Sequence, residues 1–125
     1  CNCTYCMKTR AWKSFVKPDA FRLIRGADTA VGYRRHPQAS EKFHCPACGV
    51  HTHERGDADY MGGPFVGLFV ASLDDVPAAT FAAAPVRYAD GLHDNWRAAP
   101  AETALTSPLL SLSLRPSLIL IGAAA

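Results

Sequence analysis

The placement of the five cysteines constrains this chain more than any other feature of its sequence. Cys1, Cys3 and Cys6 form one cluster, and Cys45 and Cys48 form a second. The odd count leaves one thiol over in any disulfide scheme, whereas short-range clusters are typical of metal chelation, in which one cation gathers several thiolates. The pattern predicts a zinc-thiolate protein with reduced cysteines, and reduced thiols favour a cytoplasmic location.

Two arrangements of ligands are compatible with this spacing. In the first, the two C-x-x-C pairs, Cys3 with Cys6 and Cys45 with Cys48, close one structural four-cysteine zinc site, as in a zinc ribbon. In the second, the first cluster alone holds a catalytic zinc whose fourth position stays open. Spacing alone favours the first arrangement, because structural sites are the commoner outcome of such pairs. That arrangement leaves Cys1 without a role, however, and needs a longer interval between the pairs than ribbons usually have.

Short segments separated by frequent turn signals indicate an all-β or β-rich fold. The largely apolar run 65–72 is the best candidate for a buried central strand, and it follows the break in the chain at 62–64. Asp74 and Pro77 predict the start of a short helical segment that ends before Pro85. The remaining predicted strands are 14–17, 21–25, 30–34, 41–44, 50–53 and 86–88.

Composition and charge argue against several classes of protein. Hydrophobic residues make up 49% of the chain and charged residues 19%, which disfavours a disordered protein. The net charge of +2 provides no field that would attract nucleic acid, so we expect no nucleic-acid partner. The segment 106–125 is rich in Leu and Ser, and its longest uninterrupted apolar stretch, 118–125, is too short to span a bilayer. We therefore expect no membrane anchor and predict a disordered or extraneous tail.

The sequence C-N-C-T-Y-C-M-K at residues 1–8 resembles the C-x-C-x-x-C-x-K segment of a known family. This is the glutathione-dependent formaldehyde-activating (GFA) family, which includes centromere protein V-like proteins. The resemblance covers roughly residues 1–103, and the segment 104–125 has no counterpart in it. Further similar segments follow in the same order at 43–49, 70–75, 84–91 and 93–96.

The resemblance implies an Mss4-like zinc-binding fold of short strands, with two zinc ions in a full-length domain. It implies that Cys1, Cys3 and Cys6 hold the catalytic zinc. Cys45 and Cys48 would belong to a structural zinc, completed by a C-x-C pair upstream of the first cluster. That pair is absent from a chain whose residue 1 is Cys. We therefore expect residues 1–103 to be a GFA-like domain that lacks its amino-terminal strand, with one zinc site incomplete.

The function implied by the resemblance is that of a zinc-dependent carbon–sulfur lyase-type enzyme. It would join or release formaldehyde at the thiol of glutathione, as an S-(hydroxymethyl)glutathione synthase does, with Cys1, Cys3 and Cys6 as its catalytic residues. The alternative is a zinc-stabilised β module that binds a partner without turnover, since a fold alone does not decide function. His93 and Trp96 are candidates to line a pocket, although a tryptophan is more often simply packed.

Polar residues beside the cysteines have both a functional and an ordinary interpretation. Lys8, Arg10 and Lys13 follow the first cluster, and His51 and His53 follow the second. The three cations are suited to the carboxylates of glutathione, but exposed Lys and Arg more often have no special role. The two histidines are suited to completing a site of two cysteines and two histidines, but ordinary strand histidines are the commoner case.

Overall fold

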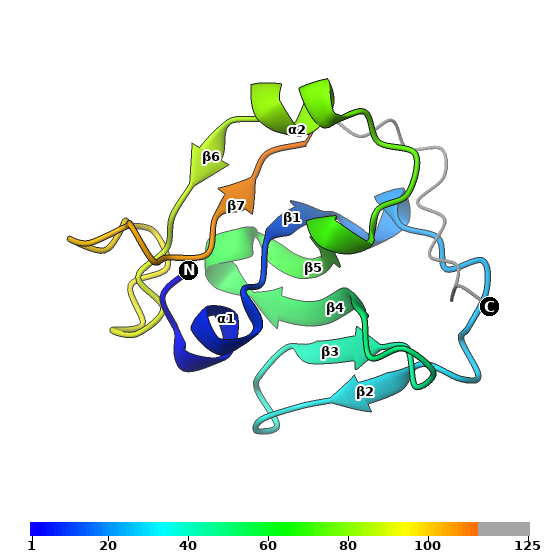
Figure 1. Cartoon of the computed structure of the whole chain (residues 1–125). Coiled ribbons are helices and arrows are strands. Elements are labelled where there is room, and N and C mark those ends of the chain that lie inside the picture. The colour runs from blue at the N-terminus through cyan, green and yellow to red at the C-terminus, as the bar shows by residue number, and fades with distance from the viewer. Residues whose placement is uncertain (113–125) are drawn as a thin grey trace.

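The computed structural model describes residues 1–112, and the main feature of that part of the chain is one seven-stranded sheet. The strands follow the order β2-β3-β4-β5-β1-β7-β6, from the bottom to the top of Figure 1. Their bounds are β1 Lys13–Val16, β2 Val31–Tyr33, β3 Glu41–His44, β4 His51–Ala58, β5 Gly63–Phe69, β6 Val86–Arg87 and β7 Leu109–Leu110. The prediction of a β-rich fold is confirmed.

The helical segments within residues 1–112 are short. They are α1 Thr4–Thr9 and α2 Ala78–Ala83, together with the 3-10 turns η1 Pro18–Ala20, η2 Asp59–Met61 and η3 Val70–Ser72. The helix predicted after Pro77 is therefore present as α2. None of the helices described has the length and apolar character needed to cross a membrane.

The longest strands, β4 and β5, form an antiparallel pair at the centre of the sheet, with His53 opposite Leu68. Gly62 closes the connection between them with a φ of 73°, a left-handed conformation that glycine adopts without steric cost. The last five residues of β5 are all buried, as expected for a central strand covered on both faces. The predicted strand at 65–72 is thus present up to Phe69, and its last three residues turn into η3.

Two clusters of apolar side chains form the core. One consists of buried Phe21, Val66 and Leu68 with the partly buried Val16, Leu23 and Leu73. The other consists of buried Cys1, Cys6, Ala11 and Phe69 with the partly buried Cys3, Tyr5, Trp96 and Leu109. The first cysteine cluster therefore belongs to the hydrophobic core and does not lie on a surface loop.

The segment 21–25, predicted as a strand, is not part of the sheet in the described chain. Its neighbour in the sequence, β1, pairs with β5 over its whole length on one edge and with β7 at Lys13 and Ser14 on the other. Phe21 instead packs into the core against Val66 and Leu68.

Part of the predicted tail belongs to the sheet. β7 pairs in parallel with β1 and antiparallel with β6, and its Leu110 is buried. Ser107 Oγ donates a hydrogen bond to the carbonyl oxygen of Cys6 at 2.9 Å. The expectation of disorder from residue 104 onward therefore does not hold for β7, because this short apolar run covers an edge of β1. The rest of the predicted tail, 113–125, lies outside the described residues.

Candidate metal centre

Local structure brings the first three cysteines together. Cys3 is the N-terminal cap of α1, with extended backbone angles of φ −63° and ψ 155°, and Met7 N–H donates to its carbonyl oxygen at 3.0 Å. Cys6 follows three residues later, and side chains at this spacing lie on the same side of a helix. The residues before α1 place the sulfur of Cys1 beside those of Cys3 and Cys6. The short helix α1 was not predicted from the sequence.

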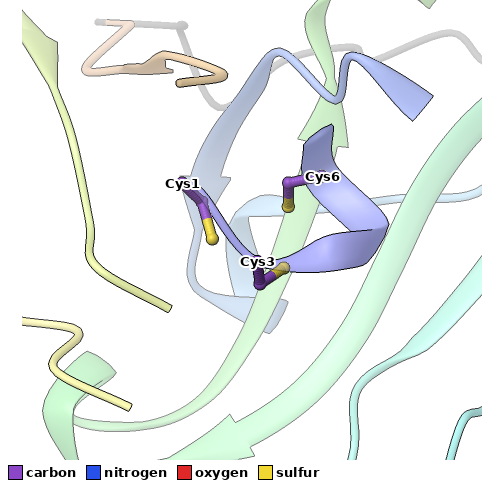
Figure 2. Close-up of side chains that lie close together, drawn as sticks. All are labelled: Cys1, Cys3 and Cys6. Atoms are coloured by element: carbon purple, nitrogen blue, oxygen red, sulfur yellow. The ribbon is translucent and has the colours of Figure 1, made fainter. Parts of the chain in front are cut away.

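The sulfur atoms of Cys1, Cys3 and Cys6 all lie within 4.8 Å of one another. Figure 2 shows the three side chains turned toward a common space, with Cys6 on α1 and the other two on the segment that leads into it. Cys1 and Cys6 are each 2% exposed, while Cys3 is partly exposed.

This donor set fits a zinc ion. Tetrahedral zinc with Zn–S bonds of about 2.3 Å places its sulfur ligands about 3.8 Å apart, so the observed separations need only small side-chain adjustments. Thiolates are soft ligands that select zinc over the harder magnesium and calcium ions. With three ligands, a tetrahedral ion keeps its fourth position for water or a substrate.

Hydrogen bonding within the cluster shifts the pKa values of the Cys3 and Cys6 thiols in opposite directions. A hydrogen bond with the Cys6 thiol lowers the pKa of Cys3 to about 5. The same bond, together with burial, raises the pKa of Cys6. Cys3 is therefore the more acidic of the two thiols, and a metal ion that binds both displaces the proton of Cys6.

Asn2, between two of the cysteines, fastens the cluster to the loop 89–92. Its Nδ2 donates to Asp90 Oδ1 at 2.7 Å, and its Oδ1 accepts from the N–H of Leu92 at 2.9 Å. Its backbone N–H donates to the carbonyl oxygen of Ala89 at 3.2 Å. These three bonds tie together segments that are almost 90 residues apart, and the sequence alone did not indicate them.

An aromatic pair stands beside Cys1. Trp96 stacks on Tyr60 with ring centroids 5.5 Å apart and an interplanar angle of 6°. Trp96 belongs to the core cluster that contains Cys1, and both aromatic residues line the same cavity as the cysteines. Trp96 is therefore packed in the core, as its ordinary interpretation has it, and also lines the cavity. His93 is not among the lining residues; its Nδ1 lies 2.8 Å from Asp90 Oδ2.

The three cysteines line a cavity of about 1060 Å³. Its lining carries more positive than negative side chains. The positive ones are Lys8, Lys13, Arg35, Lys42, Arg87 and Arg97, and the negative ones are Glu54, Asp57 and Asp94. Of the three cations that follow the first cluster, Lys8 and Lys13 line the cavity, whereas Arg10 lies outside this lining and donates to the carbonyl oxygen of Leu105 at 3.1 Å.

A buried set of charges forms part of this wall. Lys13 Nζ donates to Glu54 Oε1 at 2.8 Å, and Lys42 Nζ lies 3.6 Å from Glu54 Oε2. Ser40 Oγ also donates to Oε2 at 3.2 Å. The side chains of Lys13, Glu54 and Lys42, called the charge cluster below, are 8%, 2% and 12% exposed. Sequence analysis missed Glu54 and Lys42, because strand pairing alone brings β1, β3 and β4 together here.

Comparison with known proteins gives no match: no family model, no curated protein and no solved structure is significantly similar to the chain. The assignment to the GFA family and to an Mss4-like fold therefore stays a prediction.

The second cysteine pair lies elsewhere, in the turn between β3 and β4. Gly49, with a φ of 74°, donates its N–H to the carbonyl oxygen of Cys45 at 2.8 Å. Cys45 is buried and Cys48 is exposed. Within residues 1–112 the only group of three or more residues placed so that it could hold a metal ion is Cys1, Cys3 and Cys6, and it does not include Cys45 or Cys48.

The two histidines of β4 are packed against aromatic rings. The ring of His53 stacks on Phe43 with centroids 4.5 Å apart, and His53 is 1% exposed. The ring of His51 stacks on Phe69 at 5.1 Å. Neither histidine belongs to the metal-binding group found in the described residues. Their ordinary interpretation as strand residues therefore accounts for their positions.

Proposed function

We propose that Cys1, Cys3 and Cys6 hold one zinc ion with an open coordination position, and that the protein is a zinc-dependent enzyme of the carbon–sulfur lyase type. The observation that carries this proposal is the joint position of the three sulfurs, within 4.8 Å of one another and on the wall of a cavity of about 1060 Å³. A purely structural zinc needs four closed ligands and no adjoining space. Three ligands beside a large cavity are typical of a catalytic ion.

The proposed substrate is the adduct of a small thiol and an aldehyde, with glutathione and formaldehyde as the preferred pair. Glutathione carries two carboxylates, and the excess of positive side chains in the cavity suits a molecule of this charge. Lys8, Arg87 and Arg97 are exposed and line the cavity, so they are available to bind carboxylates. A cavity of this volume also holds a tripeptide, since ligand pockets commonly measure about 300–1,000 Å³.

The reaction adds the thiol across the aldehyde carbonyl. The sulfur forms a bond to carbon, the carbonyl π electrons move to oxygen, and the thiol proton ends on that oxygen to give a hydroxymethyl thioether; the lyase direction reverses these steps. A zinc ion bound at the cysteines would supply Lewis acidity and would favour the thiolate form of the substrate. The chain's own contribution is to hold the three ligands, to bind the substrate's carboxylates and to enclose the reacting groups.

A binding module without turnover is the second candidate. One observation favours it: Glu54, the buried carboxylate of the cavity wall, has both oxygens occupied by Lys13, Lys42 and Ser40. A carboxylate engaged in this way is poorly placed to act as a general base. In this alternative the zinc centre would bind a thiol ligand and release it unchanged.

Zinc content and adduct exchange test the proposal together. We expect one zinc ion per chain by elemental analysis of the reduced protein. With ¹³C-formaldehyde and glutathione, exchange NMR should show faster formation and breakdown of the adduct than in buffer alone. Cys3→Ser is the control and should reduce the rate to that of the buffer. Zinc binding without acceleration would favour the binding module, and a protein that takes up no zinc would refute the metal centre.

A further inference from the structure

The charge cluster has an excess positive charge that its own members do not balance. Two ammonium groups, of Lys13 and Lys42, share the single carboxylate of Glu54. All three side chains are largely withdrawn from solvent. An uncompensated charge is unfavourable in such a position, so the cluster calls for an anion nearby.

The cysteine cluster, on the wall of the same cavity, is a candidate for that anion. Lys13 lines the same cavity wall as Cys3 and Cys6, and it follows directly after the turn that ends α1. The Lys13 ammonium lies 5.9 Å from the ring centroid of Phe69, and Phe69 packs in the same core cluster as Cys1 and Cys6. Three thiolates around one Zn²⁺ carry a net charge of −1, and this matches the excess of +1 in the charge cluster.

From this match we propose that the charge cluster is the counter-charge of the metal centre, and that Lys13 and Lys42 are positioning residues that stabilise the negatively charged zinc–thiolate centre. The inference rests on the proposed zinc site and adds a role for residues that do not touch the metal. It also gives a reason for burying two lysines beside one carboxylate, because burying an ion pair is seldom stabilising by itself.

The sheet is shaped to hold these charges. Gly67 on β5 faces Glu54, and a Cβ atom at position 67 would lie only 2.7 Å from Glu54 Cγ and 2.8 Å from its Oε1. Only glycine at position 67 leaves enough room for the Glu54 carboxylate, which accepts the hydrogen bond from Lys13. The Lys13 ammonium lies 5.5 Å from the ring centroid of Phe15, and the Lys42 ammonium lies 4.9 Å from that of Tyr5. Aromatic faces at these distances favour the charged form of a lysine without offering it a second anion.

Two substitutions break the same ion pair but change the charge near the sulfurs in opposite directions. Lys13→Met lowers the net charge of the cluster from +1 to zero, whereas Glu54→Gln raises it to +2. A role in folding alone predicts that both variants weaken zinc binding alike, because both lose the 2.8 Å contact. A counter-charge role predicts weaker binding for Lys13→Met and unchanged or tighter binding for Glu54→Gln.

The test is the zinc affinity of each variant, measured in the reduced protein by competition with a chromophoric chelator at constant pH. We expect Lys13→Met to weaken zinc binding by about tenfold or more, because it removes one unit of positive charge near the metal centre. Lys13→Arg should restore most of the affinity, and Glu54→Gln should bind at least as tightly as the wild type. Circular dichroism checks the fold of each variant. If Lys13→Met does not fold, Lys42→Met takes its place, because it removes the other ammonium group of the cluster. It too should weaken zinc binding.

Equal losses of affinity in the lysine and glutamate variants would overturn this inference while leaving the zinc site in place. A wild-type protein that takes up no zinc would overturn the proposed metal centre, and the inference with it. The two failures are therefore distinguished by the zinc content of the wild type.

Discussion

Gly91 lies directly against Cys1: a Cβ atom at position 91 would come within 2.8 Å of Cys1 Sγ. The same atom would lie 2.6 Å from the ring of Trp96. Glycine is therefore the residue that lets the loop 89–92 approach both the first sulfur ligand and the ring of Trp96. The contact with Cys1 cannot be read from the sequence, since 90 positions separate the two residues.

The first prediction follows from this close approach. Gly91→Ala should displace Cys1 or Trp96 and weaken zinc binding by about tenfold or more, because overpacking at such a contact costs roughly 1–3 kcal/mol. Chelator competition measures the effect. Gly26→Ala is the control: it strains a residue with a φ of 80° that does not line the cysteine cavity, so it should lower stability and leave zinc affinity unchanged. Equal affinities in the two variants would contradict the prediction.

The second prediction concerns the clamp formed by Asn2. Asn2→Ala removes the side-chain bonds to Asp90 and Leu92, and we expect it to lower the free energy of unfolding by about 1–2 kcal/mol. Zinc affinity should fall as well, since Cys1 and Cys3 flank the clamp. Chemical denaturation and chelator competition measure the two effects. The matched control is Asn95→Ala, at an exposed position of the same region, and a loss of stability as large as that of Asn2→Ala would argue against the clamp.

The third prediction separates the two groups of cysteines. Cys3→Ser should abolish tight zinc binding, because it leaves only two thiolates in the first cluster. Cys48→Ser should keep the zinc of the first cluster and change stability by no more than about 0.5 kcal/mol, because Cys48 is exposed. Elemental analysis of the purified variants, combined with thermal unfolding, decides the matter. Loss of the same zinc ion in both variants would restore a single site shared by the two pairs.

The fourth prediction is a loss of stability in mild acid that depends on His53. Burial and the charge of Arg55 lower the pKa of this histidine to about 4. In the unfolded chain it takes up a proton near pH 6.5, whereas in the folded protein it stays neutral down to about pH 4. Above about pH 6.5 the ring is neutral in both the folded and the unfolded protein, and the free energy of unfolding is highest. As the pH falls from 6.5 toward 4, only the unfolded chain takes up the proton, and the free energy of unfolding decreases by roughly 2–3 kcal/mol.

Denaturation curves at several pH values measure this dependence. His53→Gln removes the titrating group, so its stability should change much less between pH 7 and pH 4 than that of the wild type. His36→Gln is the control, because His36 is exposed, and it should keep the wild-type dependence. An unchanged slope in His53→Gln would show that another group controls stability in this range.

The local features of this protein were predictable from its sequence. The spacing of Cys1, Cys3 and Cys6 places three sulfurs on six consecutive residues, so chain connectivity alone keeps them within reach of one ion. The β-rich fold follows from short apolar segments between turn residues, and the strand at 41–44 was predicted with its observed bounds. Each of these features depends on neighbours in the chain and needs no knowledge of distant contacts.

Only the tertiary structure decided what surrounds the sulfurs. The charge cluster exists because pairing of β1, β4 and β3 through the sheet brings Lys13, Glu54 and Lys42 together. The segment 21–25 has strand propensity, yet it stays out of the sheet, and its Phe21 packs against Val66 and Leu68 in the core. These outcomes depend on which of several distant segments packs against which. A local pattern predicts that a residue can enter a strand or bind a metal, whereas long-range packing determines which partners it meets there.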